Sequence, residues 1–182
     1  MRYYILQLVL LVPWVTALGV SDWRHHRLPN LWVFSGGALG LALGLGWGGV
    51  RLAGNSLLAG LVCGLFLLLP FFLRMAGGGD VKMLFACGLW MTTLDVLPFL
   101  TFTAFASVPL ALVLLCKRKL TLARVKHYLR VLFDWRYDRK AGKAQLPPAD
   151  APQCGVPYGI AIGAGAIMTI VFRMILLSRA GQ

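Results

Sequence analysis

The sequence contains no glutamate: its six acidic residues are all aspartate, against 18 lysines and arginines. Charged residues make up only 13% of the 182 residues, and apolar residues make up 59%. About a quarter of a soluble domain is charged, so this composition argues against a water-soluble fold and excludes intrinsic disorder. The four cysteines stand alone, and without a Cys-x-x-Cys pair they support neither a thiolate zinc site nor a secreted disulfide framework.

Long apolar runs are what the sequence does contain. About 20 apolar residues in a helix cross a hydrocarbon core of ~30 Å, so these runs predict an all-α, polytopic membrane protein with a single domain over residues 1–182. We expect the first run to be kept as a span and not cleaved as a signal peptide, because more positive charge follows it than precedes it. Six transmembrane helices are expected, at about 3–20, 31–49, 53–73, 82–97, 98–116 and 157–177.

Lysine and arginine are unevenly distributed among the connections. The first, third and fifth loops hold 14 of them, while the termini and the remaining loops hold four. Positive residues stay on the cytoplasmic side, which predicts that both termini are external and that these three loops are cytoplasmic. Arg173, inside the last span, is expected to reach the external interface. In the fifth loop, residues 117–152, apolar residues recur at helical spacing, so we expect an amphipathic helix on the anionic inner leaflet and no nucleic-acid binding.

Two aspartates, Asp22 and Asp80, are expected at helix ends on the cytoplasmic boundary of the membrane, where a carboxylate is costly enough to indicate a function. Two carboxyls that lie close together cannot both ionise easily, so they share a proton near neutral pH. One can then activate a water as base while the other hydrogen-bonds a peptide carbonyl, as in aspartic proteases. The remaining four are expected to have solvated roles in polar turns or loops: Asp95, Asp134, Asp138 and Asp150.

Three glycines, Gly77, Gly78 and Gly79, directly precede Asp80. Glycine allows a positive φ and lets another chain approach the backbone closely, so a substrate strand could lie against this segment. The helix that follows favours an anion at its N-terminus, where Asp80 stands. The alternative is that the glycines form a flexible turn and that Asp80 serves only as a helix cap.

Three segments together resemble one known family. Residues 77–82, Gly-Gly-Gly-Asp-Val-Lys, resemble the Gly-x-Gly-Asp-x-Lys signature of type IV prepilin peptidases, which are intramembrane aspartic proteases. Asp22, a basic residue after it and Leu28-Pro29-Asn30 resemble the first aspartate loop of that family. Residues 156–159, Val-Pro-Tyr-Gly, are similar to the segment that opens its last helix. Because paired Cys-x-x-Cys motifs are missing, the chain is most similar to the short TadV/CpaA-like branch, which favours peptidase over N-methyltransferase activity.

The resemblance implies a prepilin leader peptidase of the bacterial inner membrane, with Asp22 and Asp80 as catalytic residues facing the cytoplasm. Its substrate would be a type IV or Flp-type prepilin, or a pseudopilin, whose short basic leader is removed after a glycine. Neither a cofactor nor a metal is expected. The residues expected to bind substrate or shape the loops are Gly77, Gly78, Gly79, Pro29, Asn30, Pro157, Tyr158 and Gly159.

Three cationic residues, Arg24, Arg27 and Lys82, are candidates for electrostatic support of the two aspartates, although the same residues suit an interfacial anchor or a contact with lipid phosphate. Two other classes of function stay open. A small transporter would use the aspartates as a proton relay, yet it would prefer ionisable groups near the bilayer midplane. A non-catalytic assembly factor for a pilus or secretion system would use the basic loop to hold partners.

Overall fold

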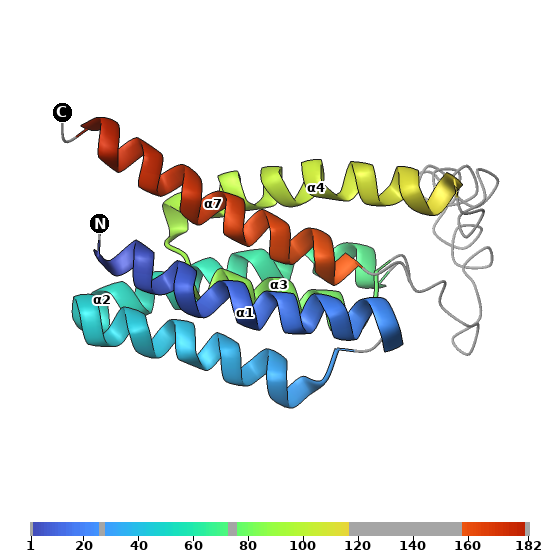
Figure 1. Ribbon diagram of the computed structural model, residues 1–182. Coiled ribbons are helices and arrows are strands. Elements are labelled where there is room, and N and C mark those ends of the chain that lie inside the picture. Colours follow the sequence, from blue (N-terminus) through green and yellow to red (C-terminus); the bar gives the residue numbers. More distant parts are fainter. Residues whose placement is uncertain (1, 26–27, 73–75, 117–157, 181–182) are drawn as a thin grey trace, which may run out of the picture.

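The computed structural model describes residues 2–25, 28–72, 76–116 and 158–180, and within them every regular element is helical (Figure 1). This confirms the all-α prediction. The amphipathic helix expected in residues 117–152 lies outside the described residues. The elements are α1 (Arg2–His25), α2 (Asn30–Phe72), α3 (Gly78–Gly88), the 3₁₀ turn η1 (Thr93–Asp95), α4 (Val96–Cys116) and α7 (Tyr158–Ala180).

Four helical segments are long and apolar enough to cross a bilayer: α1, α2, Thr93–Val113 and Tyr158–Arg179. The chain is therefore a multi-pass membrane protein, while the count of six spans and their orientation stay predictions. The bounds expected at 31–49, 53–73, 98–116 and 157–177 hold within a few residues. By contrast, α1 continues to His25 and so includes Asp22 within its last turns, and the helix expected at 82–97 is interrupted.

A sharp bend at Gly49 divides α2. Gly49 has φ 64° and ψ −162°, a conformation that glycine adopts easily because it lacks a Cβ. A Cβ on Gly44 would lie 3.5 Å from Oγ of Ser56, although the rise of a straight helix between these positions is about 18 Å. The chain therefore folds back on itself, and the two halves of α2 correspond to the helices expected at 31–49 and 53–73.

The helix expected at 82–97 is not continuous, because α3 ends at Gly88 and a turn follows. Its 11 residues rise only about 16 Å, roughly half of a hydrocarbon core. The helix packs closely on α2: a Cβ on Gly88 would lie 2.7 Å from Cα of Gly60. In the turn, Met91 donates its N–H to the Gly88 carbonyl at 3.0 Å, and the carbonyl of Trp90 accepts a hydrogen bond of 2.7 Å from the buried amide of Gln7.

Indole rings and glycines fill the interface of α1, α2 and α3. Trp14 and Trp90 stack with ring centroids 5.9 Å apart, and Nε1 of Trp90 donates to the carbonyl of Gly36 at 3.0 Å. A Cβ on Gly36 would lie only 1.9 Å from the ring of Trp14, so a larger residue there would displace the indole. Cys63 and Cys87 are buried and free in the same core.

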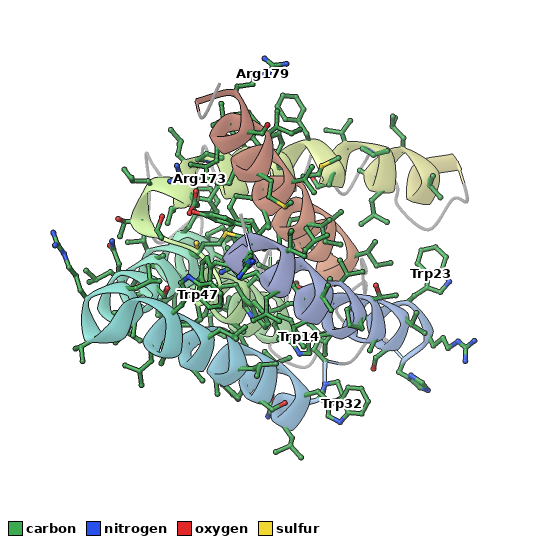
Figure 2. The ribbon with its side chains drawn as sticks, turned by 60° about the vertical axis from the view of Figure 1, so that its left-hand side comes forward. Trp14, Trp23, Trp32, Trp47, Arg173 and Arg179 are labelled. Atoms are coloured by element: carbon green, nitrogen blue, oxygen red, sulfur yellow. The ribbon has the colours of Figure 1, made fainter. Side chains whose placement is uncertain are left out.

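Asp95 corrects the expectation of a solvated role. The residue is only 5% exposed, and its carboxylate forms an ion pair with Arg173 of α7, labelled in Figure 2. Its Oδ2 also accepts hydrogen bonds from the N–H of Thr92 at 3.1 Å and from the Thr92 hydroxyl at 2.7 Å. A buried carboxylate needs such partners because its desolvation is costly. The Arg173 side chain thus pairs with Asp95. The sequence had instead predicted that it reaches the external interface.

Candidate active site

Three segments that are distant in the sequence meet at one end of the molecule. Figure 1 shows the last turn of α1, the first turn of α3 and the first turn of α7 at the end opposite to both termini. These segments carry Asp22, Asp80 and Gly159, respectively. The predicted residues therefore come together on one side, as the topology of the predicted loops requires.

Asp22 is buried, with 6% of its surface exposed, and it joins the first helix to the last. Its Oδ2 accepts a hydrogen bond of 2.9 Å from the N–H of Gly159. That N–H is free for the contact because Gly159 is the second residue of α7 and the first turn of a helix has no internal acceptors. A Cβ on Gly159 would lie 2.8 Å from Oδ2 of Asp22 and 3.1 Å from Sδ of Met83, which explains the need for glycine here.

Asp80 is the third residue of α3, outside the four candidate spans, and it caps its own helix. Its Oδ2 accepts the N–H of Gly77 at 3.2 Å. Burial, and then the negative charge of Asp22, raise the pKa of Asp80 to about 7, against the opposing effect of the Gly77 hydrogen bond. Asp80 is therefore partly protonated near neutral pH, and the two carboxyls lie close enough to influence each other electrostatically.

The glycine segment has neither the positive φ that the sequence allowed nor the flexible turn that it left as the alternative. Gly77 is extended, while Gly78 and Gly79 already belong to the first turn of α3, and among the described glycines only Gly49 has a positive φ. The small size of Gly78 and Gly79 therefore serves close packing and not an unusual backbone conformation. A Cβ on Gly79 would lie 3.3 Å from Cδ1 of Leu28, and one on Gly78 would lie 3.3 Å from the ring of Phe71. The capping role that the sequence left open for Asp80 is confirmed.

The segment between α1 and α2 is attached directly to α3. Nζ of Lys82 donates a hydrogen bond of 3.1 Å to Oδ1 of Asn30, and Leu28 lies against Gly79. The carbonyl of Pro29 accepts the N–H of Val33 at 3.1 Å and so supports the first turn of α2. Lys82 thus contacts the first aspartate loop. The sequence had also allowed a lipid phosphate as the partner of this side chain.

The other predicted residues lie at the rim or outside the described part. Tyr158 opens α7 and lies near Ser107 of α4. Arg24 is exposed near the end of α1, and Arg27 and Pro157 lie outside the described residues. In the part of the chain that the structure describes, no group of three or more His, Cys, Asp or Glu side chains could hold a metal ion.

A groove of about 490 Å³ runs between α1 and α7 beside the buried aspartate. Apolar and small residues make up most of its walls, with Thr16 and Arg24 as the polar exceptions. The groove ends next to the contact of Asp22 with α7, because Ile160 in its wall directly follows Gly159. Other lining residues are Val15, Gly19, Val20, Trp23, Gly163, Ala164 and Ile167.

Sequence reasoning missed two residues of the site, Met83 and Ser107, because neither belongs to a motif. Met83 stands three positions after Asp80, so helical periodicity alone places it on the same face of α3 and could have identified it. Ser107 gave no such signal, since it lies within an apolar helix and its neighbour Tyr158 is distant in the sequence.

Comparison with known families gives one match to this chain. The model of the Type IV leader peptidase family matches residues 9–114. This range is more than half of the chain and contains both Asp22 and Asp80, whereas α7 lies outside it. No curated protein and no solved structure matches the chain.

Proposed function

The chain belongs to the Type IV leader peptidase family, and from this premise we propose that it is a membrane aspartic endopeptidase that removes the basic leader of a prepilin or pseudopilin. The family is one of aspartic leader peptidases, so the catalytic groups must be carboxyls. The observation that supports Asp22 and Asp80 in this role is that the charge of Asp22, together with burial, raises the pKa of Asp80 to about 7. Aspartic proteases depend on such proton sharing.

The surroundings of the two carboxyls favour different roles for them. Asp22 accepts the N–H of Gly159 at the N-terminus of α7, where a negative charge is stabilised, so we assign it as the base that takes a proton from water. Asp80 is partly protonated near neutral pH, and its protonated form donates a hydrogen bond to the oxygen of the scissile carbonyl. The hydroxide adds to the carbonyl carbon, and the proton on Asp22 then passes to the leaving nitrogen as the peptide bond breaks.

The substrate must present its scissile bond as an extended strand, because the carbonyl of a helical peptide is shielded within its own turn. Cleavage after a glycine on the cytoplasmic side fits this proposal, since the charge distribution predicts the loops near Asp22 and Asp80 to be cytoplasmic. The Flp-type prepilins of tight-adherence systems are the substrate class that the resemblance to the TadV/CpaA-like branch implies.

The groove between α1 and α7 is where we place the apolar helix that follows the scissile bond of such a substrate. Its wall residues Gly19, Gly163 and Ala164 are small, which lets another helix approach closely within the membrane. Because the groove ends beside Gly159, a helix lying in it would bring its N-terminal end to Asp22.

Incubation of the purified protein in liposomes with a candidate Flp-type prepilin tests the proposal. We expect mass spectrometry to find the prepilin shortened by its leader. Asp22→Asn and Asp80→Asn should each lower the rate on the order of 10²- to 10⁴-fold, the usual contribution of a general acid or base. The double variant should be no slower than the worse single variant, because the two groups act as a unit. Normal turnover by either single variant would disprove the assignment.

A further inference from the structure

The helices that carry Asp22 and Asp80, α1 and α3, do not pack chiefly on each other. α1 packs chiefly on α7, while α3 packs chiefly on α2. The distance between the carboxyls of Asp22 and Asp80 therefore depends on contacts that bridge these two pairs of helices. One bridge is Gly159, which bonds to Asp22 and approaches Met83 of α3.

The chain segment that joins α1 to α2 also links the two pairs of helices, and its α2 end is attached to α3. There Nζ of Lys82 donates to Oδ1 of Asn30 at 3.1 Å, one turn away from the contact of Gly79 with Leu28. Lys82 follows Asp80 by two positions, about 200° around the helix, so its side chain leaves α3 away from the Asp80 carboxyl. Asn30 is the first residue of α2 and follows directly on the segment that leads away from Asp22.

We propose that Lys82 and Asn30 are positioning residues whose hydrogen bond fixes the first turn of α3 against the start of α2 and so sets the distance between Asp80 and Asp22. A hydrogen bond from an ammonium group is stronger than one between neutral groups, which suits it to hold two chain segments near the membrane surface. The activity readout of this proposal rests on the proposed function, because it uses cleavage of a prepilin.

Loss of this bond should impair catalysis more than folding. The capping bond between Gly77 and Asp80, and the close packing of Gly88 on Gly60, would still hold α3 in place. A displacement of catalytic groups by about 1 Å can cost on the order of 10²-fold in rate. Since Lys82 and Asn30 do not touch the reacting atoms, their loss should lower kcat and leave KM nearly unchanged.

The test compares Lys82→Met, Asn30→Leu and their double variant with wild type. Each single variant should lower kcat about 10- to 100-fold, and the double variant should match the worse single variant. Lys82→Arg and Asn30→Asp keep a donor and an acceptor, so we expect both to retain near-normal kcat. Arg51→Met, which removes an exposed cation from the second half of α2, is the matched control and should have no effect.

Three kinetic outcomes would overturn the proposal. Losses that multiply in the double variant would mean that the two residues act independently. A change confined to KM would assign them to substrate binding. A loss seen in vesicles of phosphatidylcholine with phosphatidylglycerol but not in phosphatidylcholine alone would mean that Lys82 acts through anionic lipid headgroups.

Hydrogen exchange separates this proposal from the proposed function. Lys82→Met should speed backbone exchange in residues 30–33 and 78–82 relative to Arg51→Met, whether or not the protein cleaves a prepilin. Faster exchange with no cleavage by wild type would keep the Lys82 contact and reject the peptidase. Cleavage by wild type with unchanged exchange in Lys82→Met would reject the contact and keep the peptidase.

Discussion

Oδ2 of Asp22 accepts a hydrogen bond of 2.9 Å from the backbone N–H of Gly159, although 137 positions separate the two residues in the sequence. The bond closes the site between the first and the last helix. The family match ends at residue 114, before α7 begins, so this part of the site is supplied by a segment that the match does not cover.

Gly159→Ala should therefore damage the site. Its Cβ would lie 2.8 Å from Oδ2 of Asp22, so the carboxyl must move and weaken its hydrogen bond. We expect a loss of cleavage on the order of 10²-fold, as for a displacement of about 1 Å. Gly46→Ala in α2 is the control, because nothing lies within 4 Å of its Cβ. Equal rates for the two variants would show that the Asp22–Gly159 contact is not needed.

The protonation of Asp80 predicts how activity and stability depend on pH. Burial and the charge of Asp22 raise the pKa of Asp80 from 3.8 to about 7, so the native protein holds more protons than the unfolded chain between these values. Stability should then fall as the pH rises from about 4 to about 7. Cleavage should also fall above about pH 7, as the acid loses its proton.

Thermal unfolding and cleavage rates measured across this range in one detergent would check both effects. Asp80→Asn removes the titration, so at pH 8 we expect it to unfold at a higher temperature than wild type. The opposite order would show that Asp80 is already ionised in the native protein at neutral pH.

Filling the groove between α1 and α7 should impair substrate binding selectively. Val20 lines the groove and Val9 lies outside it on the same helix, and the two are 48% and 60% exposed. We expect Val20→Trp to raise KM for a full-length prepilin, whereas Val9→Trp should not. Neither variant should alter cleavage of a peptide that ends shortly after the scissile bond. If Val20→Trp has the same KM as wild type for the full-length substrate, the apolar helix lies elsewhere.

The ion pair of Asp95 and Arg173 predicts a large effect on stability. Arg173→Met would leave the Asp95 carboxylate buried without its cation, which should cost about 3 kcal/mol of unfolding free energy. Adding Asp95→Asn removes the unpaired charge, so the double variant should regain much of that loss. Unfolding in detergent measures both, and equal stability of Arg173→Met and wild type would show that the pair is not stabilising.

The sequence predicted the parts of this fold that depend on local patterns. Apolar runs located α1, α4 and α7. The motif segments selected Asp22 and Asp80, whose catalytic role stays a prediction. The end of α3 could not be read in this way, because Leu89, Trp90 and Met91 are buried in the turn and continue the apolar run of the helix. Hydropathy does not distinguish a buried turn from a helix that continues.

The sequence alone also could not predict that Asp95 pairs with Arg173 or that Lys82 pairs with Asn30. These partners are 78 and 52 positions apart, and nothing in the local sequence of one indicates the other. A charged residue near a membrane boundary was assigned to water or lipid, whereas the folded chain supplied a protein partner. Such pairs depend on how the helices pack, which a single sequence does not specify.

The hydrogen bond from Gln7 to the carbonyl of Trp90 changes how the first helix should be judged. A hydropathy profile counts Gln7 against membrane insertion of α1. Yet the turn after α3 is irregular backbone within a membrane protein, and lipid offers no substitute for the water that would satisfy such a carbonyl. The Gln7 side chain satisfies the Trp90 carbonyl instead. A more hydrophobic first helix, with leucine at position 7, would therefore make the folded protein less stable.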